Sequence, residues 1–159
     1  MSLSNRVLIT GGEGFTGRYF ANYLGDLGFE VAILTSNLLD AAAINSEITS
    51  CQPDFVVHLA AISYADFDRA ADYYRANVEG TVNVLEALKK SGKCIKKVIL
   101  ASSAAVYGSQ EVELLHEVLM PNPVSHYGAS KLAMEYASKL YNSHFPTIRV
   151  RPFNYTGIG

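Results

Sequence analysis

The sequence predicts an α/β fold in which helices cover both faces of a parallel β-sheet. Two observations predict it. Short apolar segments rich in β-branched residues alternate along the chain with longer segments whose apolar residues recur at helical spacing. The short segments are apolar throughout rather than at every second residue, which is typical of parallel strands buried on both faces. Together they indicate a doubly wound Rossmann sheet.

The expected elements follow one another in strict alternation. We expect strands at residues 6–10, 30–34, 55–59, 97–101 and 147–151, and helices at residues 15–27, 41–50, 72–91 and 127–142. No internal repeat, low-complexity tract or charged linker interrupts this order. Residues 1–159 are therefore expected to form one Rossmann domain.

Composition and charge narrow the possible partners. The formal net charge is -2 and the 13 Lys and Arg residues are scattered, so we expect no nucleic-acid partner. No apolar run reaches the length of a membrane span, and the first strand begins too early for a leader segment. Cys51, Cys94 and the four His residues are dispersed, which predicts reduced thiols, no metal site and a cytoplasmic protein.

A glycine-rich loop joins the first expected strand to the first helix. Gly11, Gly14 and Gly17 have the G-x-x-G-x-x-G spacing, which by itself is equally consistent with an ordinary turn. In this position the first glycine would make the turn, the second would admit a pyrophosphate, and the third would bring helix and strand together. The phosphate would meet the free N–H groups and positive dipole end of the helix.

The end of the second expected strand bears on the choice of dinucleotide. NAD-selective sites usually place an acidic residue there to bind the ribose hydroxyls, but this chain has Thr35 and Ser36. Arg18, just after the glycine loop, would suit a 2′-phosphate, although it is equally plausible as a solvated helix residue. We therefore expect NADP or NAD as the cofactor, with NADP slightly favoured.

A phenol and an ammonium group occur together in the last expected helix. Tyr127 and Lys131 are four residues apart, hence on one helical face, and a neighbouring cation favours the phenolate that proton transfer requires. Ser103 follows the fourth strand at the carboxyl edge of the sheet, where ligands bind in such folds. The alternative for Ser103 is a strand-end residue that caps its own backbone.

The chain resembles the extended short-chain dehydrogenases, the NAD-dependent epimerase/dehydratase group. The resemblance covers essentially the whole chain and depends on these segments: TGGEGFTG at residues 10–17, HLAA at 58–61, NVEGT at 77–81, SSAAVYG at 102–108, YGASK at 127–131 and RPFN at 151–154. It implies that Tyr127 is the general acid/base and that Lys131 binds the nicotinamide ribose and favours the phenolate. Ser103 would hydrogen-bond the reacting oxygen of the substrate.

The resemblance also implies further binding residues. Asp40 matches a contact to the adenine, Asn77 matches a buried helix residue that supports the active-site backbone, and Asn154 matches a substrate-phosphate contact. The remaining expected cofactor-binding residues come from the glycine loop, the end of the third strand and the last motif: Phe15, Thr16, Leu59, Ala60, Ala61, Pro152 and Phe153. The implied partner is a nucleoside-diphosphate sugar, and the implied assembly is a homodimer formed by the helices at 72–91 and 127–142.

The reaction type remains open among several alternatives. Family dehydratases carry an acid just after the catalytic hydroxyl, whereas this chain has Ala104 and Ala105, so dehydration is disfavoured. Residues 151–157 and 35–40 resemble the 4-keto-6-deoxy-sugar reductases, which we slightly prefer, and residues 103–108 resemble the 4-epimerases. A non-catalytic NAD(P)-binding scaffold or sensor is the third possibility.

Members of this family are longer than 159 residues and have a second half that encloses the sugar nucleotide. We therefore expect this chain to be the N-terminal half of a longer protein, without the C-terminal substrate domain. We also expect it to bind cofactor poorly on its own.

Overall fold

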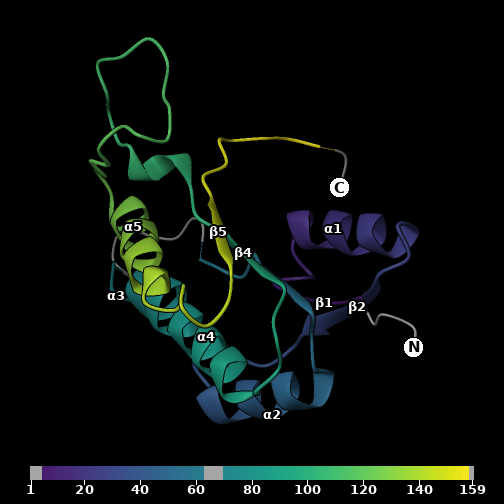
Figure 1. Cartoon of the computed structure of the whole chain (residues 1–159). Helices are drawn as coiled ribbons and strands as arrows, with labels where there is room; N and C mark the ends of the chain where they lie inside the picture. The colour runs from purple at the N-terminus through teal and green to yellow at the C-terminus, as the bar shows by residue number, and fades with distance from the viewer. Residues whose placement is uncertain (1–4, 63–69, 158–159) are drawn as a thin grey trace.

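The computed structural model, described here for residues 5–62 and 70–157, contains five parallel strands in the order β2-β1-β3-β4-β5 (Figure 1). Its elements are β1 (Arg6–Thr10), α1 (Phe15–Asp26), β2 (Glu30–Leu34), α2 (Ala41–Cys51), β3 (Phe55–His58), α3 (Ala70–Tyr74), the π-helical turn η2 (Arg75–Glu79), α4 (Gly80–Lys90), β4 (Lys97–Ala101), the 3₁₀ turn η3 (Ala104–Val106), α5 (His126–Lys139) and β5 (Thr147–Val150). The prediction of a doubly wound parallel sheet is confirmed.

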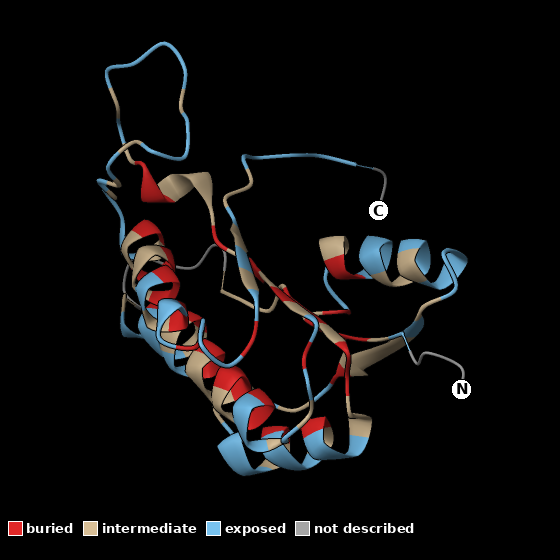
Figure 2. Ribbon diagram, in the orientation of Figure 1, coloured by how far each residue is buried: buried red, intermediate tan, exposed pale blue. Residues whose placement is uncertain are grey.

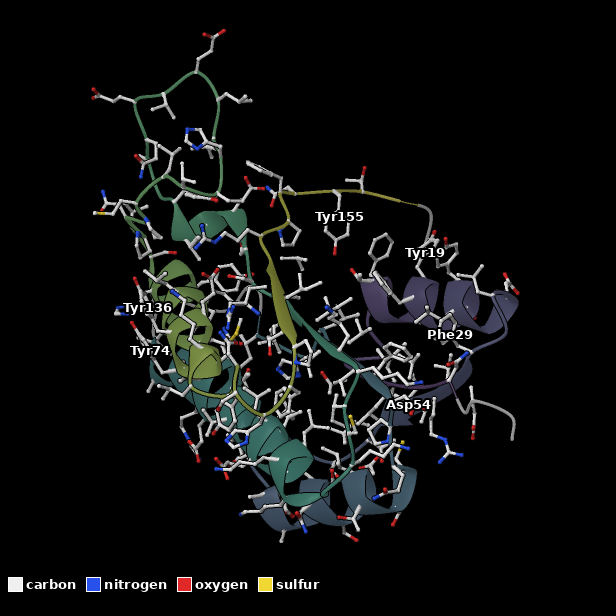
Figure 3. All side chains as sticks on the ribbon, in the orientation of Figure 1. Tyr19, Phe29, Asp54, Tyr74, Tyr136 and Tyr155 are labelled. Carbon is white, nitrogen blue, oxygen red and sulfur yellow. The ribbon has the colours of Figure 1, made fainter. Side chains whose placement is uncertain are left out.

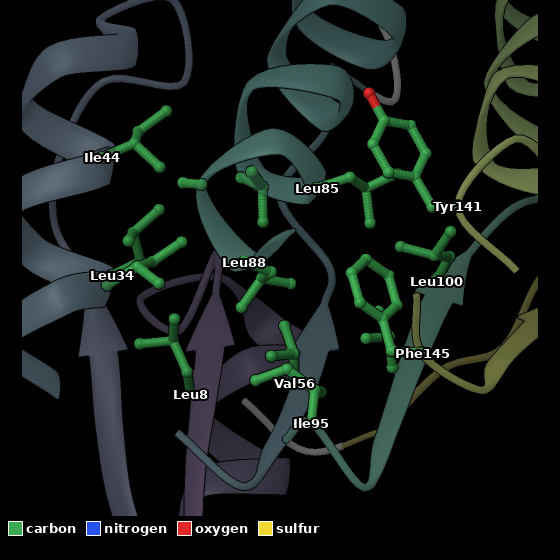
Figure 4. Close-up of a cluster of buried hydrophobic side chains, with 14 of the residues drawn as sticks. Leu8, Leu34, Ile44, Val56, Leu85, Leu88, Ile95, Leu100, Tyr141 and Phe145 are labelled. Carbon is green, nitrogen blue, oxygen red and sulfur yellow. The ribbon is translucent and has the colours of Figure 1, made fainter. Parts of the chain in front are cut away.

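One face of the sheet carries the larger hydrophobic core. Alternate residues of β1, β3 and β4, including Leu8, Val56 and Leu100, pack against apolar side chains of α2, α4 and α5 (Figure 4). Ile44 of α2 and Leu85 of α4 are fully buried in this cluster. Burial of apolar surface on this face accounts for most of the hydrophobic stabilisation of the fold.

The opposite face is covered by α1 and has a smaller core. Val7, Ile9 and Val57 are buried there, and partly buried residues of α1 and β2 pack against them. Figure 2 shows that α1 is mostly exposed or intermediate, whereas α4 and α5 contain many buried residues. The two faces therefore differ in how tightly their helices are packed.

The helix expected at residues 72–91 is interrupted, which corrects the prediction of one continuous α-helix. α3 begins at Ala70, and the turn at Arg75–Glu79 is π-helical before α4 continues to Lys90. The N–H of Gly80 donates to the carbonyl of Arg75, so one extra residue is accommodated in the turn. The other elements agree with expectation apart from small shifts at their ends.

The strand order fixes where a ligand can bind. The chain passes from β1 to β2 on one side and then returns to β3 on the other side of β1. Such a reversal opens a crevice beyond the carboxyl ends of the strands, which is where ligands bind in doubly wound sheets. Among the described residues, no helix is long and apolar enough to cross a membrane.

Candidate functional site

A cavity of about 570 Å³ lies at this crevice, beyond the carboxyl ends of β1, β3 and β4. It brings together most of the residues expected from the sequence: Gly11, Gly14, Phe15, Thr16, Gly17, Leu59, Ala60, Ala61, Ser103, Tyr127, Lys131, Pro152, Phe153 and Asn154. Segments from both ends of the chain thus line one continuous cavity.

The glycine loop forms one wall of the cavity, and its shape depends on the absence of side chains. Gly11 has φ +70°, and a Cβ there would lie 2.8 Å from the backbone nitrogen of Ala60. A Cβ on Gly17 would overlap the carbonyl oxygen of Gly11. Gly14 caps α1 without a side-chain hydrogen bond, so the first N–H groups of the helix are available for an anion. These features fit the pyrophosphate of a dinucleotide.

Ser103 lines another part of the cavity, two residues after the end of β4. Its Oγ accepts a hydrogen bond from the N–H of Ala105 at 3.1 Å and caps the short turn η3. A hydroxyl has one hydrogen and two lone pairs, so this cap leaves the hydrogen for a ligand in the cavity. The capping role and the expected substrate contact are therefore compatible.

Tyr127 is placed beside Ser103 by the start of α5. Ser125 caps the helix by accepting from the N–H of Gly128 at 3.1 Å. A Cβ on Gly128 would lie 2.5 Å from the carbonyl oxygen of Ala105, so only glycine allows the first turn of α5 to approach the turn after Ser103. Ser103 and Tyr127 consequently line the same cavity.

Lys131 lies four residues after Tyr127 in α5 and is buried, with only 4% of the residue exposed. Its Nζ donates to the carbonyl oxygen of Ala101, at the end of β4, at 2.8 Å. Burial lowers the pKa of Lys131 to about 8, because desolvation penalises the charged ammonium. An ammonium group has three donors, so two remain for hydroxyl groups of a ligand.

A chain of buried hydrogen bonds runs behind the cavity through His58. Thr81 Oγ1 donates to the carbonyl of Asn77 at 2.7 Å, so it accepts from His58 Nε2, 2.9 Å away. His58 Nδ1 must then accept from Thr10 Oγ1 at 2.7 Å, and Thr10 Oγ1 in turn accepts from the N–H of Ala60. The partners therefore fix one neutral tautomer.

Burial and the nearby Lys131 cation lower the pKa of His58 to about 3, which keeps the imidazole neutral. In the sequence, His58 is dispersed from the other imidazoles and begins the HLAA segment, but neither observation assigned it a role. Its two hydrogen-bond partners, Thr10 of β1 and Thr81 of α4, come from separate elements and could not be predicted from spacing.

Asn77 extends this network from η2 to the segment after β3 and to α5, whose residues line the cavity. Its Oδ1 accepts from the N–H of Ile62 at 3.0 Å, and its Nδ2 donates to the carbonyl of Ile62 and to Ser130 Oγ. Asn77 therefore ties the segment after β3 to α5, next to Tyr127 and Lys131. It does not line the cavity itself.

Two other expected cofactor residues also lie outside the cavity lining. The guanidinium group of Arg18 donates to the carbonyl oxygen of Glu13 at 3.1 Å, on the exposed side of the glycine loop. Asp40 caps α2 by accepting from the N–H of Ala43 at 3.0 Å. Their expected contacts to a dinucleotide remain predictions.

The cavity also includes Ala101, Ser102 and Tyr155, which we did not expect from the sequence. Tyr155 reaches from the C-terminal segment toward α1, where its hydroxyl lies 2.6 Å from Thr16 Oγ1 (Figure 3). Ser102 donates to Glu135 Oε1. Ser102 and Tyr155 are adjacent in the sequence to the expected residues Ser103 and Asn154, and this adjacency could have indicated that they belong to the site.

A buried ion pair supports the wall formed by β4, β5 and α5. Arg151 donates through two nitrogens to the carboxylate of Glu135, at 2.8 and 2.7 Å, and a third nitrogen donates to Tyr107 Oη. Partial burial opposes ionisation of Glu135, but hydrogen bonds from Arg151 and Ser102 hold its pKa below the usual range. Among the described residues, no cluster of three or more His, Cys, Asp or Glu side chains could hold a metal ion.

Comparison with known proteins places this site in a family. The model of the NAD dependent epimerase/dehydratase family matches residues 7–159. A curated relative, GDP-6-deoxy-D-talose 4-dehydrogenase of Aggregatibacter actinomycetemcomitans, is 35% identical over 97% of this chain and 54% of its own length. The chain spans about half the length of the curated relatives it matches.

Solved structures agree with the fold. A putative epimerase from Burkholderia cenocepacia has a TM-score of 0.91 and 38% identity, over 98% of this chain and 56% of that one. UDP-glucose 4-epimerase of Thermus thermophilus, in complex with NAD, has a TM-score of 0.85 and 29% identity, over 92% of this chain and 54% of that one. RMD of Pseudomonas aeruginosa, complexed with NADPH, has a TM-score of 0.84 and 32% identity, over 94% and 54%.

Proposed function

This chain belongs to the NAD dependent epimerase/dehydratase family, and we propose that it carries the cofactor and proton-transfer site of a reductase that acts on a 4-keto-6-deoxy nucleoside-diphosphate sugar. One observation carries the proposal. Ser103, Tyr127 and Lys131 converge on the same cavity that begins at the glycine loop. The substrate class is supported by the similarity to GDP-6-deoxy-D-talose 4-dehydrogenase, whose name describes a reaction at C4 of a GDP-linked 6-deoxy sugar.

The residues of the cavity are suited to a nicotinamide dinucleotide. Gly11, Gly14 and Gly17 would seat its pyrophosphate on the first turn of α1. Lys131 would donate to the nicotinamide ribose with the hydrogens that its bond to Ala101 leaves free. When bound, the nicotinamide ring supplies or accepts a hydride at the sugar carbon.

The remaining step is a proton transfer at the sugar oxygen, for which this chain supplies the groups. Tyr127 Oη would give its proton to the carbonyl oxygen at C4 as that carbon receives the hydride. The hydroxyl hydrogen of Ser103 would donate to the same oxygen and stabilise its developing charge. The Lys131 ammonium group would favour the phenolate left on Tyr127.

Residues around Ser103 argue against dehydration as the reaction. Elimination of water requires an acid for the departing hydroxyl, and Ala104 and Ala105 follow Ser103 in the turn η3. Their methyl groups cannot transfer a proton. Reduction and epimerisation both remain chemically possible with the groups present.

A 4-epimerase is the second candidate, supported by the similarity to UDP-glucose 4-epimerase of Thermus thermophilus. The two reactions differ in cofactor balance. A reductase oxidises one NAD(P)H for each 4-keto sugar consumed, whereas an epimerase returns its hydride and consumes none. Incubation of a longer product that contains this chain with UDP-, GDP- and dTDP-linked sugars and their 4-keto forms, followed at 340 nm and by product analysis, separates them.

Substitution Tyr127→Phe tests whether the site is catalytic. We expect turnover to fall by about 10²–10⁴-fold, the usual contribution of a positioned general acid, while dinucleotide binding is retained. Tyr136→Phe is the matched control, because Tyr136 lies on the same helix with 57% of its surface exposed (Figure 3). Equal activity of the two variants would instead support a non-catalytic scaffold or sensor.

A further inference from the structure

The loop that follows β2 is held by a carboxylate from α2. Glu47 accepts hydrogen bonds from both backbone N–H groups of Thr35 and Ser36, at 2.8 and 3.0 Å. It also accepts from the hydroxyl groups of Thr35 and Ser36, at 3.3 and 2.5 Å. The backbone N–H and hydroxyl donors of Thr35 and Ser36, the two residues that follow β2, are therefore all directed to one carboxylate.

This loop is where a dinucleotide on the glycine loop would place its adenosine ribose. β2 pairs with β1, and Gly12 lies so close to Ile33 of β2 that a Cβ there would be 2.7 Å from Ile33 Cγ2. In doubly wound sheets the ribose hydroxyls, or a 2′-phosphate, are recognised at the end of this strand. The charge at Thr35 and Ser36 consequently bears on the choice between NAD and NADP.

The loop has little freedom to turn its donors toward a phosphate. Asn83 of α4 donates to the carbonyl of Leu38 at 2.9 Å, and Asn37 Oδ1 accepts from the N–H of Leu39 at 2.9 Å. Asp40 then caps α2. With Glu47 at one end and Asn83 in the middle, the short loop is fixed from two helices.

Charge in this region opposes a 2′-phosphate. Partial burial disfavours the charged form of Glu47, but hydrogen bonds from Ser36 and Thr35 outweigh it and hold the pKa below its ordinary value. Glu47 is therefore an anion at neutral pH. The sequence has no Lys or Arg between residues 31 and 68, and the exposed Arg18 of α1 donates to the backbone carbonyl oxygen of Glu13. Nothing in that stretch of sequence neutralises a second anion.

We propose that Glu47 makes this site select NAD(H) over NADP(H), because its carboxylate occupies the donors and the charge position that a 2′-phosphate would need. α2 thus supplies the acidic group that the end of β2 lacks. The inference depends on the proposed function, in that it assumes a dinucleotide on the glycine loop. It also reverses the slight preference for NADP that the sequence suggested.

Binding of NADH and NADPH, titrated by the fluorescence of the reduced nicotinamide, tests the proposal. We expect wild-type chain to bind NADH at least about 10-fold more tightly than NADPH, and Glu47→Gln to reduce this ratio by about 10-fold through tighter NADPH binding. Glu30→Gln is the matched control, because it removes the same charge at the opposite end of β2 and should leave the ratio unchanged.

A second measurement on wild-type chain needs no variant. Repulsion between Glu47 and a 2′-phosphate is screened by salt, so the NADH/NADPH ratio should fall as ionic strength rises from 0.02 to about 0.5 M. Equal affinity for both dinucleotides, or a ratio unaffected by Glu47→Gln in a folded variant, would overturn the proposal. Failure of both this chain and a longer product that contains it to bind either dinucleotide would overturn the proposed function, and this inference with it.

Discussion

The two walls of the candidate site keep their shape by different means. On the side of α1, the glycine loop depends on close backbone contacts, since Gly11 and Gly17 leave no room for a Cβ. On the side of α5, buried polar groups determine the geometry, through His58, Asn77 and the Lys131 contact to Ala101. The first wall should be sensitive to side-chain size, and the second to hydrogen bonding and pH.

This difference matches the chemistry expected of each wall. A pyrophosphate needs backbone N–H groups at close range, and only residues without a side chain allow that approach. Proton transfer needs groups held in one orientation and one protonation state, which a fully bonded buried network provides. Every buried side-chain N and O atom among the described residues has a hydrogen-bond partner.

Gly17→Ala should produce the largest effect. Its Cβ would overlap the carbonyl oxygen of Gly11, so α1 would have to move away from the sheet. We expect a loss of about 4 kcal/mol or more in the free energy of unfolding, measured by urea titration, together with loss of dinucleotide binding.

Gly25→Ala is the control, because a Cβ there meets no atom within 4 Å and the residue lies in the same helix. This variant should gain about 0.5–1 kcal/mol from helix propensity and retain binding. Similar behaviour of the two variants would show that the fit of the glycine loop does not control the first wall.

Asn77→Ala tests the second wall and should have the next largest effect. It breaks the bonds to Ile62 and Ser130 and leaves the partly buried backbone N–H and carbonyl of Ile62 without the Asn77 partner. We expect a loss of about 2–3 kcal/mol in unfolding free energy, with faster hydrogen exchange of the Ile62 amide. Asn83→Ala, which breaks one bond to Leu38, should cost about 1 kcal/mol. A smaller loss for Asn77 than for Asn83 would contradict the network.

These two walls also differ in how far the sequence predicted them. The position of the glycine loop between β1 and α1 agrees with the prediction, because its residues lie in one short segment and its shape depends on a local turn. Ser103, Tyr127 and Lys131 were predicted as a set from their motifs, and the structure brings them to one cavity. Strands and helices followed from apolar periodicity, which reflects burial directly.

Residues that act through distant partners were not predictable in the same way. Glu47 contacts Thr35 and Ser36 from another element, and no spacing rule relates an acid within a helix to the preceding strand end. The π-helical turn at Asn77 changes the pattern by a single residue, too little to alter the apolar periodicity of the helix. Arg18 and Asp40 show the converse, because local bonds to Glu13 and Ala43 compete with the expected roles.

His58→Gln should change the acid stability of the second wall. The pKa of His58 is about 3 in the folded chain and 6.5 when unfolded, so the unfolded state binds the extra proton below pH 6.5. Stability should therefore fall on acidification, and this one group should remove about 2 kcal/mol between pH 6.5 and 5.

In His58→Gln that part of the pH dependence should disappear, although the variant is less stable at pH 7. His144→Gln, at an exposed imidazole, is the control and should keep the wild-type slope. Urea titrations at several pH values measure how the free energy of unfolding depends on pH in both variants. An unchanged slope in His58→Gln would mean that the imidazole is not held neutral.

Lys131 should have the smallest effect, at alkaline pH. Burial lowers its folded pKa to about 8 from the usual 10.5, so the folded state releases its proton first and stability should rise above pH 8. Between pH 8 and 9 the gain from this group is about 1 kcal/mol. Lys131→Met should lose this rise, whereas Lys139→Met, at an exposed position of α5, should keep it. If the unfolding free energy changed with pH in the same way for wild type, Lys131→Met and Lys139→Met, the prediction that Lys131 has a lowered pKa would be wrong. A rise confined to chains with Lys131 would show that the cation lowers stability where it lies, as expected of a group retained there for chemistry.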